Sequence, residues 1–206
     1  MAPNSPPDRI NATFLTSAPS LRHCPPDGEP EVAFAGRSNA GKSSVLNQIA
    51  GHRGLAKVSK TPGRTQLINF FDVEPGGRLV DLPGYGYAKA GKAQQATWQH
   101  AVNDYLSNRD SLVGLVLVTD IRHPNQPYDL ELIEWARASE LPLRVLLNKA
   151  DKLSFSKQKN ALQAFNKRHG HPLLTAQRFS ASKGEGRDEL LLCLTEWLSS
   201  SLAANQ

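Results

Sequence analysis

The sequence predicts an α/β fold in which a mostly parallel sheet lies between two layers of helices. Two nearly continuous apolar runs, at residues 113–118 and 143–147, have the composition of strands that are covered on both faces. Segments with helical spacing of apolar residues alternate with these runs along the chain. Two further apolar runs, 67–73 and 78–81, are separated by a short turn rich in Pro and Gly and predict a hairpin. We therefore expect a three-layer α/β/α sandwich with one antiparallel edge strand.

The predicted elements follow one another from residue 30, and residues 1–29 are expected to be an irregular segment with a short extended piece at 12–16. The polar or glycine-rich stretches at 52–66 and 84–91 are predicted to be flexible loops. No internal repeat or low-complexity linker interrupts residues 30–206, which predicts one domain. Beyond the hairpin and the two buried runs, we expect strands at 32–35 and 173–180 and helices at 43–50, 92–108, 129–140, 157–168 and 188–202.

Composition excludes several classes of protein. The 206 residues contain only two cysteines, Cys24 and Cys193, and these are too far apart for a disulfide scaffold or a cysteine zinc site. The first 30 residues are rich in proline and have no basic-then-apolar run, so we expect no signal peptide. No apolar stretch approaches the roughly 20 residues that span a bilayer. We therefore expect a soluble, cytoplasmic, monomeric protein without a membrane span.

The charge of the chain is unevenly distributed. The formal net charge is +5, and acidic residues are absent from residues 47–71, 82–103 and 152–184. The last of these tracts contains seven lysines and arginines. Segregated positive charge predicts a polyanionic partner such as RNA. The alternative is a solvated basic face that has no partner.

Residues 36–44 read GRSNAGKSS and match the pattern G-x-x-x-x-G-K-[ST] between a predicted strand and a predicted helix. Glycines at the two fixed positions let the backbone curl until several N–H groups point at one anion. The lysine can reach the β- and γ-phosphates, and the following serine hydroxyl can ligate Mg²⁺. A chance glycine-rich turn is the alternative, but the flanking elements favour a phosphate loop (P-loop) that binds a nucleoside polyphosphate. Its expected contacts are Gly36, Arg37, Ser38, Asn39, Ala40, Gly41, Lys42 and Ser43.

Two later loops offer groups to Mg²⁺ and to a γ-phosphate. The D-x-x-G sequence at residues 81–84 follows a predicted strand. Its carboxylate can hold a water on Mg²⁺, and its glycine N–H can approach the γ-phosphate. In the loop before the hairpin, Thr65 is the candidate hydroxyl for the Mg²⁺ shell, with Thr61 as a competitor. A loop whose order depends on the γ-phosphate reports the nucleotide state. The expected contacts are Gly63, Arg64, Thr65, Gln66, Leu67, Asp81, Leu82, Pro83 and Gly84.

The sequence N-K-x-D at residues 148–151 favours guanine over adenine. Guanine presents two donors, N1–H and the 2-amino group, which the carboxylate of Asp151 can accept, whereas adenine leaves that carboxylate unpaired. Asn148 can tie this loop to the P-loop, and the stem of Lys149 can cover the base. The backbone N–H of Ala181 can donate to guanine O6. These considerations predict a GTP site rather than an ATP site, with base contacts from Asn148, Lys149, Ala150, Asp151, Phe179, Ser180 and Ala181.

Taken together, these residues resemble a translation-factor-type GTPase, and most closely the bacterial EngB (YihA/YsxC) family. The resemblance rests on residues 36–44, 60–66, 81–87, 120–123 and 148–151, which run in order through nearly the whole chain. It implies a P-loop NTPase fold of the small-GTPase type, GTP or GDP as ligand, and Mg²⁺. It also implies a role in assembling the large ribosomal subunit and in normal septum formation during cell division.

One departure from the Ras pattern affects the chemistry. A glutamine that orients the attacking water follows D-x-x-G in Ras, whereas Tyr85 stands there in this chain. We therefore expect slow hydrolysis. GTPases that resemble this chain and carry asparagine at the position of Asn39 can use K⁺ beside the phosphates. We hypothesise K⁺-stimulated hydrolysis with Asn39, Lys42 and Thr65 around the reacting phosphate. The alternative is that Asn39 only hydrogen-bonds the P-loop.

Two functions are consistent with these features. The first is a GTP-hydrolysing switch that docks on ribosomal RNA or a precursor of the large subunit through its basic loops and helix. The second is a GTP-dependent switch that binds a protein at the division septum and has no direct ribosome role. An ATPase or kinase is disfavoured by residues 148–151. Arg122 and His123 are expected to be either ordinary surface residues or contacts to a partner or the nucleotide.

Overall fold

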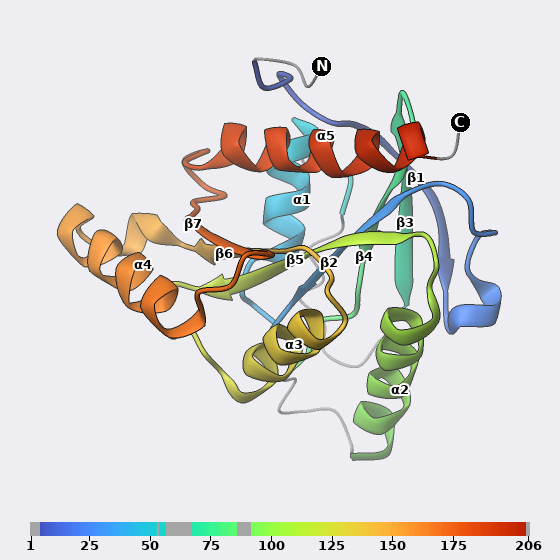
Figure 1. The fold of residues 1–206 in the computed structure, drawn as a ribbon, viewed down its shortest axis with the longest axis horizontal. Coiled ribbons are helices and arrows are strands. Elements are labelled where there is room, and N and C mark those ends of the chain that lie inside the picture. The colour runs from blue at the N-terminus through green and yellow to red at the C-terminus, as the bar shows by residue number, and fades with distance from the viewer. Residues whose placement is uncertain (1–4, 53, 57–66, 86–91, 205–206) are drawn as a thin grey trace.

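The structure is a computed structural model that describes residues 5–52, 54–56, 67–85 and 92–204. One seven-stranded sheet carries helices on both faces (Figure 1). The strands are β1 (Asn11–Ala18), β2 (Glu31–Gly36), β3 (Ile68–Glu74), β4 (Arg78–Asp81), β5 (Leu112–Asp120), β6 (Leu143–Asn148) and β7 (Leu174–Arg178). The helices are α1 (Lys42–Ala50), α2 (Lys92–Asn108), α3 (Pro127–Ala138), α4 (Phe155–His169) and α5 (Arg187–Ala204), with short 3-10 helices η1 (Leu21–His23) and η2 (Ala150–Lys152).

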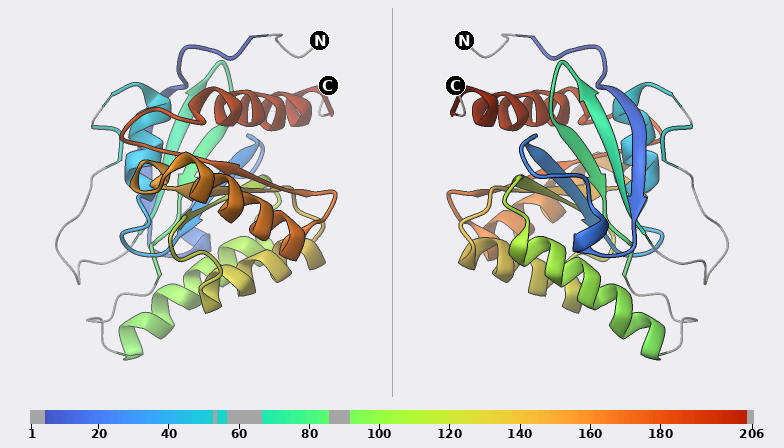
Figure 2. Two further views of the ribbon diagram at one scale, coloured as in Figure 1. Left: turned by 90° about the vertical axis from the view of Figure 1, so that its left-hand side faces the viewer. Right: turned by 90° about the vertical axis from the view of Figure 1, so that its right-hand side faces the viewer.

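The helices form two layers because the central strands bury alternate residues on opposite faces. In β2, Ala33 and Ala35 belong to the apolar cluster that α2, α3 and α4 complete, whereas Val32 and Phe34 face α1 and α5. Figure 2 shows these two helical layers on either side of the sheet. The predicted three-layer sandwich is thus confirmed. Within the described residues, no helix is long and apolar enough to cross a membrane.

The strand order is β1-β3-β4-β2-β5-β6-β7, and β3 alone runs opposite to the others. The hairpin of β3 and β4 was predicted, but its antiparallel strand is not at the edge of the sheet. β1 pairs with β3 along its whole length and forms that edge. The irregular segment predicted over residues 1–29 included a short extended piece at 12–16; β1 is longer, spans Asn11–Ala18, and is a full strand of the sheet.

The reason for this difference lies in tertiary packing. β1 exposes two large apolar residues, Phe14 and Leu15, beside a register shift that separates Phe14 from Thr16. The shift breaks the alternation of buried and exposed residues by which a strand is usually recognised. The Phe14 ring packs edge-on against Phe71 of β3, with 5.9 Å between ring centroids. Cross-strand contacts, rather than local pattern, hold β1 in the sheet.

The remaining predicted elements are present with shifted ends. α3 begins at Pro127 and ends at Ala138, two residues earlier than expected at each end. The earlier start is explained by Pro in the first turn and by the capping box that Asp129 closes with Gln126. α4 also begins two residues earlier, at Phe155. The loops predicted at 52–66 and 84–91 lie largely outside the described residues.

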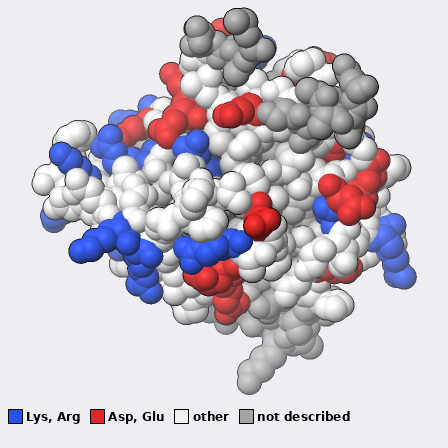
Figure 3. All heavy atoms as spheres, in the orientation of Figure 1, with Lys and Arg blue, Asp and Glu red and all other residues white. Residues whose placement is uncertain are grey.

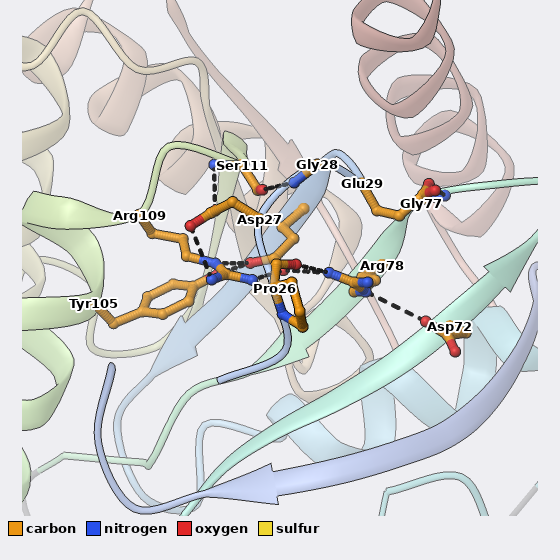
Figure 4. Close-up of polar contacts among 11 residues, drawn as sticks. Pro26, Asp27, Gly28, Glu29, Asp72, Gly77, Arg78, Tyr105, Arg109 and Ser111 are labelled. Atoms are coloured by element: carbon orange, nitrogen blue, oxygen red, sulfur yellow. Dashed lines mark hydrogen bonds and ion pairs between the residues drawn. The ribbon is translucent and has the colours of Figure 1, made fainter. Parts of the chain in front are cut away.

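A buried ionic cluster lies where β2 begins, at the end of the strand opposite the P-loop (Figure 4). Glu31 is fully buried and accepts hydrogen bonds from Arg109 Nε at 2.9 Å and from the Tyr105 hydroxyl at 2.8 Å. Arg78 of β4 approaches the same carboxylate, with 3.3 Å between Nη1 and Oε1. Asp27 forms a second ion pair with Arg109 at 3.2 Å. The cluster joins β2, β4, the end of α2 and the segment before β2, so it anchors the sheet away from the predicted nucleotide site.

Candidate functional site

The P-loop connects β2 to α1 and packs closely against the end of β5 and against Asn148. A Cβ atom at Gly36 would lie 2.6 Å from the carbonyl oxygen of Val118 in β5, and one at Gly41 would lie 2.4 Å from the side-chain nitrogen of Asn148. Gly41 also has φ = 101°, and Asn39 lies in the left-handed region with φ = 67°. These positions need small or permissive residues because the backbone approaches its neighbours so closely. A loop of this shape at the start of a helix has the form that binds phosphate groups.

Lys42 and Asp81 form an ion pair across the site, from the start of α1 to the end of β4. Both side chains are mostly buried, with exposed fractions of 10% and 12%. A cation at this position can move to phosphate oxygens, and the carboxylate can then hold a water on a divalent cation. Ser43 is the next residue of α1 and is partly exposed. Lys42, Asp81 and Ser43 thus lie together as predicted.

Among the described residues, no group of three or more His, Cys, Asp and Glu side chains has a geometry that could hold a metal ion. Ser43, the first hydroxyl predicted for a Mg²⁺ shell, lies in the first turn of α1. The second predicted hydroxyl, Thr65, lies outside the described residues, as do Thr61, Gly63, Arg64 and Gln66. Leu67 is described and lies half-buried immediately before β3.

The D-x-x-G loop contacts the P-loop directly. The Ser38 N–H donates to the carbonyl oxygen of Tyr85 at 2.7 Å, and the Leu82 N–H donates to that of Phe34 at 3.0 Å. A Cβ atom at Gly84 would lie 3.5 Å from the Gly36 carbonyl oxygen and the Ser38 nitrogen. Leu82 and Pro83 are buried between these contacts. Any group bound at the P-loop would therefore also meet the Gly84 backbone.

The Tyr85 side chain packs against α3. It is only 4% exposed, its ring lies 4.4 Å from that of Tyr128, and its hydroxyl donates to the carboxylate of Asp129 in α3. Burial and the neighbouring carboxylate raise the pKa of Tyr85 far above its ordinary value. Tyr85 is therefore neutral, and its hydroxyl is already engaged by Asp129.

Asp129 is a buried acidic residue whose role was not apparent from the sequence. It also accepts hydrogen bonds from the Thr119 hydroxyl at 3.0 Å and the Gln126 N–H at 3.3 Å. Burial raises the pKa of Asp129 although these hydrogen bonds oppose the shift. Its spacing from Gln126, typical of a capping box, was the available signal. The pairing of Asp129 with Tyr85 connects the D-x-x-G loop to α3, and this contact depends on tertiary structure alone.

The N-K-x-D loop is tied to the P-loop as expected. Asn148 is 2% exposed, and its amide donates to the carbonyl oxygen of Ala40 at 2.8 Å and accepts from the Ala181 N–H at 3.3 Å. Lys149 has φ = 63°, and its ammonium group donates to the carbonyl oxygen of Asn39 at 2.6 Å. The side chain of Lys149 therefore extends along the site toward the P-loop. Asn148 connects the P-loop, the end of β6 and the loop after β7.

Asp151 lies beside the loop that follows β7. The Ser180 hydroxyl donates to its carboxylate at 2.6 Å, and this hydrogen bond is the main reason why the pKa of Asp151 lies below its ordinary value. Phe179 is fully buried and accepts the Ala150 N–H at 3.0 Å, which aligns the two loops. An ionised carboxylate at 14% side-chain exposure remains accessible to a ligand. Asp151, Ser180 and Ala181 thus lie close together in the structure.

Arg122 and His123 follow β5 on the same rim. Arg122 binds Asp120 through Nε at 2.9 Å and Nη2 at 2.7 Å, so it is already paired. Although burial opposes it, hydrogen bonds from Arg122 and Lys149 hold the pKa of Asp120 well below its usual range. His123 lines a cavity of about 350 Å³ between the P-loop and the start of α3. The other lining residues are Arg37, Ser38, Asn39, Ala40, Thr119, Asp120, Gln126, Asp129 and Lys149.

Comparison with known proteins agrees with this geometry. Residues 31–149 match a family model described as 50S ribosome-binding GTPase. The chain is 52% identical over 187 residues to the "probable GTP-binding protein EngB" of Tolumonas auensis, with 89% of this chain and 88% of the relative covered. It is 49% identical over 186 residues to the protein of the same name in Aeromonas salmonicida, with 89% and 86% covered.

Solved structures show the same fold. A crystal structure of a probable EngB GTP-binding protein superposes with a TM-score of 0.67 at 23% identity and covers 82% of this chain and 99% of that chain. The structure of Era in complex with MgGDPNP and nucleotides of 16S ribosomal RNA gives a TM-score of 0.63 at 23% identity, with 82% and 56% covered. The P-loop, the D-x-x-G loop and the N-K-x-D loop therefore meet on a GTPase fold. About half of the residues are identical to those of EngB proteins over nearly nine-tenths of the chain. This protein belongs to the EngB family of GTP-binding proteins and is a GTPase.

Proposed function

We propose that this protein is a slow, GTP-hydrolysing switch that acts in assembly of the large ribosomal subunit. The observation that supports slow hydrolysis is the orientation of Tyr85, whose hydroxyl binds Asp129 in the core instead of a water at the nucleotide. The ribosomal role is supported by the match to the 50S ribosome-binding GTPase family. The basic, acid-free tract at residues 152–184 is consistent with a partner that is rich in RNA.

The phosphate groups of GTP would lie in the P-loop. Backbone N–H groups of residues 41–43, at the start of α1, donate to the phosphate oxygens, and Lys42 moves from Asp81 to the β- and γ-phosphates. When bound, Mg²⁺ neutralises charge between the β- and γ-phosphate oxygens. Ser43 and Thr65 are its proposed protein ligands, and Asp81 holds one of its waters. Because Gly84 adjoins the P-loop, its N–H can bind the γ-phosphate, and the D-x-x-G loop thereby responds to the presence of that phosphate.

The guanine base would lie between Lys149 and the loop after β7. Asp151 accepts hydrogen bonds from N1–H and the 2-amino group, and the Ala181 N–H is shared between the Asn148 side-chain oxygen and guanine O6. Asn148 holds the pocket and the P-loop in one arrangement, because its amide bonds to both sides. An Asp151→Asn variant should bind GTP much more weakly because its amide N–H₂ would face the guanine donors. Undiminished GTP affinity in that variant would show that Asp151 does not read the base.

Hydrolysis is expected to depend on K⁺ through Asn39. We propose that the Asn39 side chain and phosphate oxygens hold K⁺ beside the β- and γ-phosphates, where a second positive charge stabilises the transition state. The test is GTP turnover in matched K⁺ and Na⁺ buffers, with and without large ribosomal particles. Turnover should rise in K⁺, and Asn39→Ala should remove the difference. Equal turnover of the unmodified protein in both salts would refute this role.

The ribosomal role is tested by co-sedimentation with large-subunit particles in GDP, GTP and a non-hydrolysable GTP analogue. We expect binding in the two triphosphate states that weakens as salt is raised, because phosphate contacts release counterions. The Asp151→Asn variant is the matched control, since it retains the basic surface but cannot load GTP. Co-sedimentation that is absent in all three states would contradict the proposal.

A role in septum formation follows from the family resemblance and is proposed as a consequence of ribosome assembly. The alternative is a GTP-dependent switch that binds a protein at the division septum. Depletion of the protein should first accumulate incomplete large subunits and then disturb septation. Disturbed septation with unchanged ribosome profiles would instead favour the alternative.

A further inference from the structure

Phe155 is an exposed aromatic residue at the first position of α4, on the edge of the sheet that β7 forms (Figure 1). Its exposed fraction of 69% is the highest of the large hydrophobic residues described as exposed. The guanidinium of Arg178, at the end of β7, lies over its ring at 5.0 Å from the centroid. Burial in the core therefore does not explain Phe155, whereas a stacked cation already orders it.

The Arg178 guanidinium is held in place from its other side. It donates to the side-chain oxygen of Gln158 at 3.0 Å and forms an ion pair with Glu185 at 3.6 Å. Gln158 is itself buried and donates to the carbonyl oxygens of Ala150 and Leu153, at 2.9 Å and 3.0 Å. The planar pair of Phe155 and Arg178 is thus preordered, and most of the Phe155 ring remains open to solvent. Such a platform suits a planar ligand that stacks on π-systems.

The surroundings of this pair are positively charged. Lys159 lies one helical turn after Phe155 and hence on the same side of α4. Lys152 and Lys157 are exposed nearby, but Lys152 pairs with Asp151 at 3.2 Å, and Lys157, two residues after Phe155, lies on another side of α4. Figure 3 shows Lys and Arg side chains gathered at the left of the molecule, where α4 lies in Figure 1. We call Phe155, Arg178 and Lys159 the α4 platform.

We propose that the α4 platform binds single-stranded RNA, with one unpaired base stacked on Phe155 and a neighbouring phosphate on Lys159. An aromatic ring beside arginine, within a basic surface, is the combination by which proteins bind single strands. A duplex is disfavoured because its bases are already stacked on one another. The proposal rests on the proposed function, since it identifies the surface through which this GTPase contacts an RNA-rich particle.

The first experiment measures binding of a fluorescently labelled oligouridine to the full chain loaded with a non-hydrolysable GTP analogue. Phe155→Ala should weaken binding about 5- to 150-fold, which is the range for loss of one stacked base. Phe155→Trp should retain or strengthen it because a larger π-surface is kept. Phe14→Ala is the matched control, because Phe14 is also an exposed phenylalanine (59%) but lies on β1 at the opposite edge of the sheet. We expect wild-type affinity in this control.

A second experiment varies the salt concentration. Lys159→Ala should reduce the slope of log affinity against log salt by about 0.7 for a single strand, because each phosphate contact contributes about that much. Phe155→Ala should leave this slope unchanged while lowering affinity at every salt concentration. A change of slope in Phe155→Ala, or none in Lys159→Ala, would contradict the assigned roles.

The outcomes separate this inference from the proposed function. If Phe155→Ala and Phe14→Ala both bind oligouridine as the wild type does, the α4 platform is not an RNA site. That result overturns the inference, and co-sedimentation of the wild type with large-subunit particles still tests the proposed function separately. If Phe155→Ala loses the particles but keeps oligouridine affinity, the α4 platform contacts a protein, and the inference is likewise overturned.

Discussion

Replacement of Gly41 by alanine tests whether the phosphate and base sites are built as one unit. The added Cβ would lie 2.4 Å from the side-chain nitrogen of Asn148, a distance at which one group must move. Asn148 is 2% exposed and hydrogen-bonded on both sides, to Ala40 and to Ala181. The substitution therefore disturbs the contact between the P-loop and the guanine pocket, in addition to the backbone at Gly41.

The magnitude follows from two effects. Alanine at φ = 101° costs about 1–2 kcal/mol because its Cβ meets the backbone. Displacement of the Asn148 amide costs about 1–3 kcal/mol, since buried polar groups lose their partners. In the unbound protein the P-loop relieves both the strain at residue 41 and the clash with Asn148 by moving, whereas nucleotide binding requires the P-loop conformation of the wild type. We therefore expect GTP affinity to fall by roughly two to three orders of magnitude, because each tenfold change corresponds to about 1.4 kcal/mol.

The assay is equilibrium titration with a fluorescent GDP or GTP analogue, with urea unfolding measured in parallel. Gly51→Ala is the matched control. Gly51 also has positive φ, 70°, but its Cβ would meet only the flexible Arg9 side chain, at 3.1 Å. This control should lose about 1 kcal/mol of unfolding free energy and retain wild-type nucleotide affinity.

A double-mutant cycle isolates the clash. Asn148→Ala removes the amide that the new methyl group meets, so Gly41→Ala should cost less in that background by about 1–2 kcal/mol of binding free energy. Additive effects within about 0.5 kcal/mol would refute the reasoning, because the two residues would then act independently. Equal nucleotide affinities for Gly41→Ala and Gly51→Ala would refute it as well.

Three further predictions concern other contacts. Glu31→Gln should lower the unfolding free energy by about 3 kcal/mol in urea, because two guanidinium groups lose a buried charge, while nucleotide affinity of the folded protein stays constant. Tyr85→Phe should lower unfolding free energy by about 2 kcal/mol and leave GTP turnover within twofold; a large fall in turnover would place Tyr85 at the reaction. GTP affinity should persist as pH falls from 7 to about 4, because the Ser180 hydrogen bond keeps the Asp151 pKa low. Ser180→Ala should move the loss of affinity to higher pH in the same fluorescence titration.

Most elements of the fold could be predicted because their signals are local. The runs that became β5 and β6 are apolar throughout, since both faces of these strands are covered by helices. α1 is bounded by two glycines in positive φ, and both were recognisable in the sequence. β1 was the exception. Its exposed Phe14 and Leu15 carry no alternation, and only pairing with β3 determines that these residues form a strand.

The site residues likewise divide into those that local sequence predicts and those whose contacts only the structure reveals. The P-loop glycines and the residues of N-K-x-D could be assigned from the sequence because phosphate and guanine demand particular groups at particular spacings. The structure then added contacts between distant segments, such as Lys149 with Asn39 and Tyr85 with Asp129. Segments separated by tens of residues carry no local record of such pairs, so sequence patterns cannot predict them.

The sequence by itself determined the order of elements and the class of ligand, because hydrophobic periodicity and ligand chemistry act over short spans of chain. Tertiary structure decided where Tyr85 points, since only the packing of α3 supplies Asp129 as its partner. It also decided that Asn148 joins three loops and that Phe155 meets Arg178 on an open, basic surface. These contacts join segments that are far apart in the sequence and that come close together only when the sheet is folded.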